Sequence, residues 1–387
     1  MEYQLISVDD HVLEAPDAYQ KRVPAKLRDQ APKIVDLDDG FQAWVIEGQE
    51  RGRIGGLTAS AGKKFEQYSP EPVKGGYPAL PRSYYDPAER LKAMDQDGVD
   101  VEVLFPGLPG FGGGGFFGVK DVELRTACYR AYNDHVAEDW RGANPQRFVA
   151  QCALPLYDIE ETVAEVRRAY DKGHRSATFP GNPDGWGFAP LEDPHWDPLW
   201  ATLQELDIPV SLHIGGGAPP GGEAAPMGGA SSPLRTAPKG QVQAGVVKVL
   251  SSNPGIVAEF IFSGILDRFP RLKVVSVESG IGWVPFFLEL CDDVYTRQRF
   301  WTKSSLRMLP SEYAARQIYW NFWQEKAGLR LLDLIGEDHV MWESDFPHSI
   351  CNWPNSWKVI EEICVGVPPA TRRKILVDNA AALYKLN

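Results

Sequence analysis

The chain has 387 residues, of which 43% are hydrophobic and 24% are charged, a composition that supports a large core and excludes an intrinsically disordered chain. Its formal net charge of −12 repels phosphate backbones and argues against nucleic acid as a partner. The five cysteines contain no Cys-x-x-Cys pair, so neither a disulfide framework nor a thiolate zinc site is predicted.

The N-terminus has neither the basic region nor the apolar core of a signal peptide, so we expect a cytoplasmic protein. Two long uncharged stretches, 105–119 and 208–222, are interrupted by glycine and proline. Neither fits a membrane-spanning helix, and no membrane partner is expected.

Short runs of strand-forming residues recur along the chain, at 5–8, 99–105, 148–156, 176–179, 208–214, 272–277, 318–322 and 340–342. Most are near-continuous apolar stretches rather than alternating ones, which is typical of parallel strands covered on both faces. Helical patterns lie between them, at 121–140, 159–172, 195–206, 283–298, 325–335 and 369–386. This alternation predicts a (β/α)8 TIM barrel. A doubly wound sheet is the alternative, but no Gly-x-Gly-x-x-Gly follows the first strand.

Three segments do not fit a minimal barrel. We expect 33–85, with a hairpin around Asp38-Asp39-Gly40, to be an inserted cap between strands 1 and 2. The Gly/Pro-rich segment 215–240 after strand 5 has the length of a lid loop. Gly112–Gly115 predicts a flexible loop after strand 2. The whole chain, 1–387, is interpreted as one barrel domain.

Four residues at predicted strand ends form a candidate metal site. Asp9 and His11 lie two apart on the first strand, so both side chains can face the barrel interior. His213 ends the fifth strand and Asp345 follows the eighth. Two imidazoles and two carboxylates suit zinc, or manganese as the harder alternative. The remaining histidines, His135, His174, His195 and His339, are assigned structural or surface roles.

The chain resembles the amidohydrolase superfamily, in the amidohydrolase-related branch that includes aminocarboxymuconate semialdehyde decarboxylase and the resorcylate-type decarboxylases. The segments that carry the resemblance are ISVDDHVLEAPDAY, LHIGGG, VVSVESGIGWVPFFLELCDD, IGEDHVMWESDFPHSICNWPNS and DNAAALY. The resemblance implies a metal-dependent barrel. It matches Asp9 and His11 to the strand-one ligand pair, His213 to the strand-five ligand, and Asp345 to the aspartate that binds metal and shuttles a proton.

The chain departs from this family in two respects. Asp9 replaces the histidine or glutamate of the strand-one pair. Glu278 follows strand 6, where many decarboxylases of the branch carry a histidine that activates the substrate. Glu278 is therefore a candidate metal ligand or acid–base group, and a structural hydrogen bond is the alternative. His348 is expected to orient Asp345 rather than to bind metal.

The resulting hypothesis is an enzyme that decarboxylates a small aromatic or dienoic carboxylate without oxidation, with one divalent ion as cofactor and Asp345 as proton carrier. His213, Glu278 and His348 complete the predicted catalytic set. The alternative is a hydrolase that attacks an amide, ester, lactone or C–C bond with a metal-activated water. Glu278 favours hydrolysis, and the whole-chain resemblance favours the lyase. A catalytically inactive barrel that binds a ligand is a third, remote alternative. The resemblance also implies a homodimer.

Overall fold

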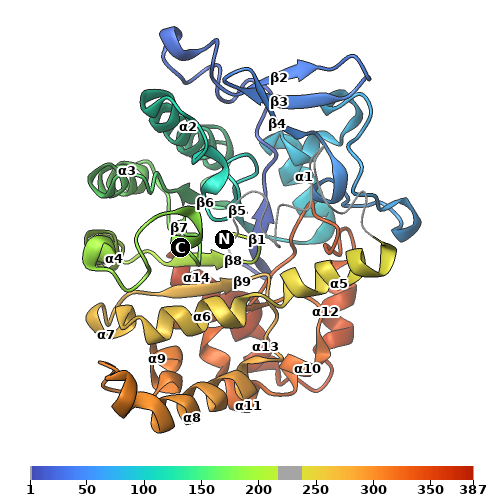
Figure 1. The fold of residues 1–387 in the computed structure, drawn as a ribbon. Helices are drawn as coiled ribbons and strands as arrows, with labels where there is room; N and C mark the ends of the chain where they lie inside the picture. Colours follow the sequence, from blue (N-terminus) through green and yellow to red (C-terminus); the bar gives the residue numbers. More distant parts are fainter. Residues whose placement is uncertain (1, 217–237, 387) are drawn as a thin grey trace.

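In the computed structural model, which describes residues 2–216 and 238–386, eight parallel strands form one sheet (Figure 1). In order around the sheet they are β1 (Ile6–His11), β5 (Val101–Phe105), β6 (Phe148–Ala153), β7 (Ser176–Thr178), β8 (Val210–His213), β9 (Val274–Val277), β10 (Ile318–Phe322) and β11 (Val340–Trp342). A parallel bridge between Asp10 and Phe346 brings the segment after β11 back to β1. The predicted barrel is confirmed.

Helices lie around the outside of the barrel (Figure 1). They are α1 (Pro87–Asp97), α2 (Val122–His135), α3 (Ile159–Asp171), α4 (Asp197–Leu206), α5 (Lys239–Leu250), α6 (Asn253–Phe262), α7 (Ile265–Arg268), α8 (Val284–Thr302), α9 (Pro310–Gln317), α10 (Lys326–Leu329), α11 (Leu332–Ile335), α12 (Ser356–Ile363), α13 (Pro369–Arg373) and α14 (Asn379–Tyr384). The Asp158 carboxylate accepts from the backbone N–H groups of Glu160 and Glu161 and so caps the start of α3.

One predicted helix is divided. The pattern over 325–335 predicts a single helix, but the chain forms α10 and α11 with a break at Arg330 and Leu331. Gly328 explains part of the local geometry, because a Cβ there would clash with the Ile281 side chain and press on the backbone N of Gly282. Gly328 lies inside α10, and its lack of a side chain lets that helix approach the backbone at Gly282 closely.

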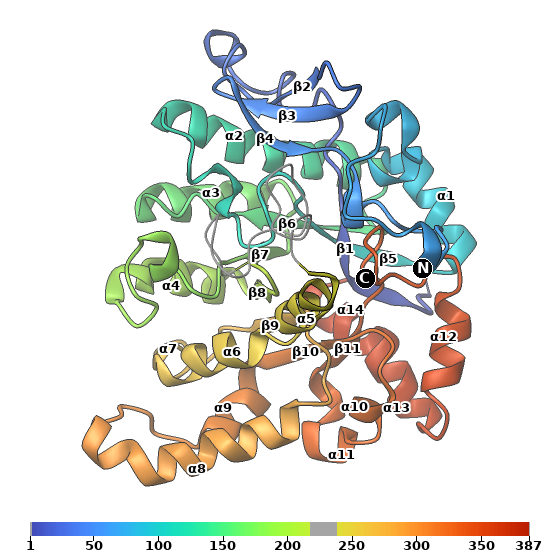
Figure 2. The same cartoon turned by 45° about the vertical axis from the view of Figure 1, so that its right-hand side comes forward.

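The segment 33–85 contains a separate antiparallel sheet of β2 (Lys33–Asp36), β3 (Gln42–Ile46) and β4 (Gln49–Arg53). Figures 1 and 2 show this sheet at the opposite end of the molecule from α8. The turn between β2 and β3 contains Gly40 at a φ of +81°, a left-handed conformation that suits glycine. Its function as a cap, like the single-domain interpretation, stays a prediction. The predicted lid loop at 215–240 falls mostly outside the described residues.

The described residues include one helical stretch, Lys239–Phe262, that is long and apolar enough to cross a membrane by length and composition. A single stretch of this kind is weak evidence, because core helices of other proteins pass the same test. Here the stretch is divided into α5 and α6, with Ser251 and Ser252 outside regular helix. Neither part approaches the ~20 residues that a membrane-spanning helix needs.

Candidate metal centre

Strand β1 carries Asp9 and His11 to the mouth of the barrel. The register between β1 and β5 shifts between Ser7 and Asp10, and such bulges re-aim side chains near functional sites. His11 Nε2 lies 3.4 Å from Asp9 Oδ1, and both side chains are buried. Asp10 instead makes a contact with the backbone: its Oδ1 accepts a hydrogen bond from the N–H of Phe346 at 3.1 Å.

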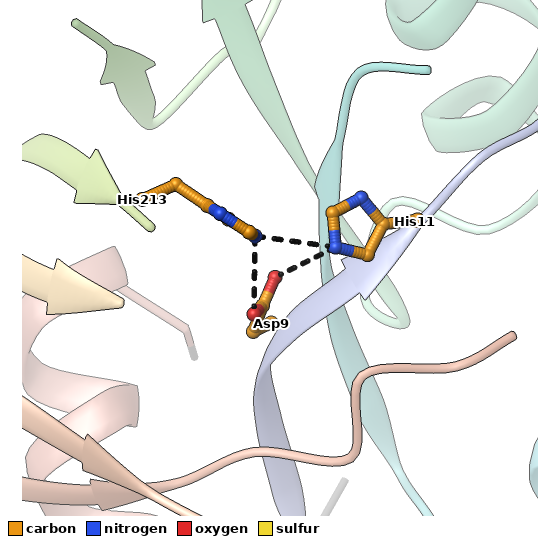
Figure 3. A group of neighbouring side chains, drawn as sticks. All are labelled: Asp9, His11 and His213. Atoms are coloured by element: carbon orange, nitrogen blue, oxygen red, sulfur yellow. Dashed lines mark hydrogen bonds and ion pairs between the residues drawn. The ribbon is translucent and has the colours of Figure 1, made fainter. Parts of the chain in front are cut away.

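His213 reaches the same point from the end of β8. Its Nε2 lies 3.3 Å from His11 Nε2 and 3.4 Å from Asp9 Oδ2 (Figure 3). The other ring nitrogen, Nδ1, lies 2.7 Å from the carbonyl oxygen of Ile214. A carbonyl can only accept, so Nδ1 carries the proton and Nε2 presents its lone pair to the cluster.

Asp345 and Glu278 complete the cluster from the ends of β11 and β9. Asp345 Oδ1 lies 3.1 Å from His11 Nε2, and Glu278 Oε2 lies 3.5 Å from His213 Nε2. Both residues have a left-handed backbone, with φ of +60° and +54°, a strained conformation that often occurs at functional sites. The structure thus brings all five predicted ligands together, whereas their individual roles stay predictions.

His348 lies beside this cluster. Its Nδ1 is 3.0 Å from Asp345 Oδ1, and its ring stacks on the His11 ring with centroids 3.7 Å apart. It also belongs to one of three groups whose ligand atoms lie within 4.8 Å of one another; the groups are Asp9/His11/His213, His11/Asp345/His348 and Asp9/Glu278/Asp345. His348 is therefore close enough to contact Asp345, and its role as an orienting residue rather than a ligand stays a prediction.

The other four histidines have partners elsewhere or lie at the surface. His135 pairs with Asp139 at 2.7 Å, His174 Nε2 contacts the carbonyl of Asn133 at 2.9 Å, and His339 Nδ1 contacts that of Ile318 at 3.0 Å. His195 is exposed. These contacts fit structural and surface roles.

The donor set fits a divalent cation. Both carboxylate oxygens of Asp9 and both of Asp345 are buried and have no hydrogen-bond partner among the described residues. Burying carboxylates that receive no hydrogen bond is costly unless a cation compensates them. Three carboxylates and two imidazole nitrogens are the ligand types that zinc and manganese accept. A single divalent ion bound here would satisfy these atoms.

The electrostatics of the cluster follow from its burial. Burial, together with the nearby Glu278 and Asp9 carboxylates, raises the pKa of Asp345 well above its usual range. Burial raises the pKa of Glu278 to about 8, although His213 opposes the shift. Burial also lowers the pKa of His11 well below its usual range, with the neighbouring His348 and His213 adding to the effect. These carboxyl pKa values are raised because burial and like charge disfavour the ionised forms, and a bound cation would offset both effects.

A buried arginine supports the strand that carries Asp9 and His11. Arg90 on α1 is fully buried, with Nη1 2.7 Å from Glu102 Oε2 on β5 and Nη2 donating to the His11 carbonyl at 2.7 Å. Its guanidinium also lies over the Phe346 ring, 4.3 Å from the centroid. Sequence reasoning missed Arg90, because no helix was predicted over 87–97 and arginines are rarely fully buried.

Glu343 is a second buried group that sequence reasoning missed. It precedes Asp345 by two residues, and its Oε2 accepts from the N–H of Glu278 at 3.2 Å. This bond joins the chain after β11 to the turn after β9, where Glu278 takes its left-handed backbone. The period-two spacing to Asp345 is the sequence signal that could have placed Glu343 on the inward face.

Comparison with known proteins agrees with this architecture. The model of the family described as Amidohydrolase matches residues 71–386. Gamma-resorcylate decarboxylase from Rhizobium sp. (strain MTP-10005) is 26% identical over 315 residues, which cover 77% of this chain and 86% of that protein. Decarboxylase orsB from Emericella nidulans is 30% identical over 274 residues, covering 67% and 73%.

The solved structure of a dihydroxybenzoic acid decarboxylase from Polaromonas sp. JS666, which holds manganese and the inhibitor 2-nitroresorcinol, has the same fold. Its TM-score is 0.63 at 19% identity, and the match covers 100% of this chain and 98% of that one.

Proposed function

The chain belongs to the amidohydrolase family, and we propose that it is a metal-dependent enzyme that removes carbon dioxide from a small aromatic carboxylate. The observation that carries the proposal is the convergence of Asp9, His11, His213, Glu278 and Asp345 at the barrel mouth. Relatives that cover most of the chain are named as decarboxylases, which supports this reaction over hydrolysis.

The residues of the cluster would have the following roles in the reaction. Asp9, His11, His213, Glu278 and Asp345 would hold a divalent ion, and its positive charge would favour binding of an anionic carboxylate. Asp345 delivers a proton to the ring carbon that bears the carboxylate, the bond from that carbon to the carboxylate breaks, and carbon dioxide leaves. His348, 3.0 Å from Asp345 Oδ1, orients the Asp345 carboxyl group toward the ring carbon.

We propose manganese as the bound metal. The sequence favoured zinc, with manganese as the alternative. Three carboxylates make the site rich in hard oxygen donors, which suit manganese, and a structural relative holds that ion. A homodimer and a cytoplasmic location stay predictions from the sequence.

The test is to strip the purified chain with a chelator, reload it with manganese or zinc, and assay carbon dioxide release from a panel of hydroxylated benzoates. We expect release only after reloading, with about one ion bound per chain. His213→Ala should lose both metal and turnover. His195→Ala, which changes an exposed histidine, should lose neither. Turnover by the chelated chain would refute the proposal.

A further inference from the structure

The loop between β5 and α2 crosses the mouth of the barrel above the histidines. A Cβ added to Gly112 would clash with the carbonyl of Gly216, which follows β8, and one added to Gly113 would meet the carbonyl of Leu154, which follows β6, at 3.5 Å. The glycines of the run 112–115, which was expected to form a flexible loop, therefore have a packing role. It lets the loop lie flat against the ends of two barrel strands.

Side chains from three other elements hold this loop in place. The Glu14 carboxylate accepts from the N–H groups of Gly107 at 3.1 Å and of Leu108 at 3.0 Å. The Thr178 hydroxyl donates to the carbonyl of Phe111, and the Tyr129 hydroxyl donates to that of Gly113. The backbone around Phe111 is thus fixed from several sides, which determines where its ring can lie.

The Phe111 ring lies against the candidate site. Its centroid is 4.4 Å from the ring centroid of His213, 4.8 Å from that of His11 and 5.6 Å from that of His348. All three histidines are buried, whereas Phe111 is only partly buried. Phe111 is therefore positioned between the histidines and the outside of the barrel mouth.

We propose that Phe111 determines the size of the ring that the site accepts, and this inference rests on the proposed function. A ligand whose carboxylate reaches the cluster must place its ring beside Phe111, where two aromatic groups can pack edge to face or offset. A second fused ring would need the space that Phe111 fills. The substrate class is then a planar carboxylate with one aromatic ring.

The test compares two ligands with the same chelating groups, 2-hydroxybenzoate with one ring and 1-hydroxy-2-naphthoate with two. Calorimetry on the manganese-loaded full chain gives each dissociation constant. We expect the wild-type chain to prefer the one-ring ligand by at least ~10-fold. Phe111→Ala should weaken that ligand about 3- to 10-fold through the lost aromatic contact and shift the preference toward two rings by at least ~10-fold. Phe111→Leu, a smaller truncation, should shift the preference toward the two-ring ligand by about threefold.

Phe117→Leu is the matched control. It lies in the same loop but packs on Trp186 and Phe188, with centroids 5.2 Å and 4.7 Å away, so both ligands should bind it within twofold of wild type. Bound manganese is measured on every variant, and Phe111→Leu carries the test if Phe111→Ala does not fold.

An unchanged size preference in folded, metal-loaded Phe111 variants would overturn the inference, as would an equal shift in Phe117→Leu or a failure of both ligands to bind wild type. If the preference shifts but no carbon dioxide is released from any ligand, the inference stands and the proposed decarboxylation fails.

Discussion

Replacing Arg90 with methionine tests whether the buried layer beneath the cluster positions the predicted ligands. The change removes the ion pair with Glu102 and the hydrogen bonds to the carbonyls of His11 and Ser83, all at 2.7 Å. Glu102 is then left buried without this partner, and breaking a buried pair typically costs about 3–5 kcal/mol. That is a large part of the ~5–15 kcal/mol that stabilises a typical domain.

A double variant separates charge from positioning. Arg90→Met with Glu102→Gln leaves no buried carboxylate at that position, so most of the lost stability should return. The His11 carbonyl still lacks its donor, so the strand end that carries Asp9 and His11 stays poorly held. Loss of such supporting contacts typically lowers metal affinity about 10–100-fold.

Urea unfolding followed by tryptophan fluorescence gives the free energy of unfolding, and calorimetric manganese titration gives the affinity. Two results would refute the reasoning. One is a free energy of unfolding that falls by less than about 1 kcal/mol in Arg90→Met, because breaking a buried ion pair typically costs more than that. The other is a double variant with wild-type metal affinity.

Three further predictions concern carboxyl groups. Asp345→Asn keeps an oxygen that can contact metal but cannot shuttle a proton, so turnover should fall at least ~100-fold with metal reduced but not absent; a metal-loaded variant that loses less than about threefold would assign the proton to another group. Glu278→Gln should abolish turnover while the thermal melt stays near that of wild type, and near-normal turnover would leave Glu278 a structural role. Burial raises the pKa of Glu14 from 4.5 to about 7, so the folded chain binds the extra proton between these values and stability falls as pH rises through that window. Between pH 4.5 and 7, the free energy of unfolding of wild type, measured in urea, should fall by up to about 3 kcal/mol relative to that of Glu14→Gln. If the difference between the two proteins does not change with pH, the pKa of Glu14 is not raised.

The sequence predicted the barrel because its strands are buried on both faces. Runs such as 148–156 and 340–342 are largely apolar with little alternation, and that pattern needs no knowledge of tertiary contacts. The candidate site followed from the same step, since carboxyl ends of barrel strands meet at one face. Asp9, His11, His213 and Asp345 were found because they lie at or just after the carboxyl ends of predicted strands.

What the sequence did not predict depends on contacts between distant segments. Arg90 looks like any arginine on a helix until its partners on β1 and β5 are known. Phe111 stands beside Gly112, whose close approach to Gly216 exists only in the fold. The left-handed backbones of Glu278 and Asp345 also depend on tertiary structure, because a positive φ is uncommon for any residue other than glycine.

The most direct test of the proposed decarboxylation is to follow oxygen from water and released carbon dioxide in one reaction. The manganese-loaded chain is incubated in water enriched in oxygen-18 with a hydroxybenzoate and, in parallel, with the methyl ester of the same acid, and each organic product is analysed by mass spectrometry. Decarboxylation predicts one carbon dioxide per organic product, with no oxygen-18 in that product. An organic product that gains oxygen-18 without release of carbon dioxide would contradict the account and identify a hydrolase.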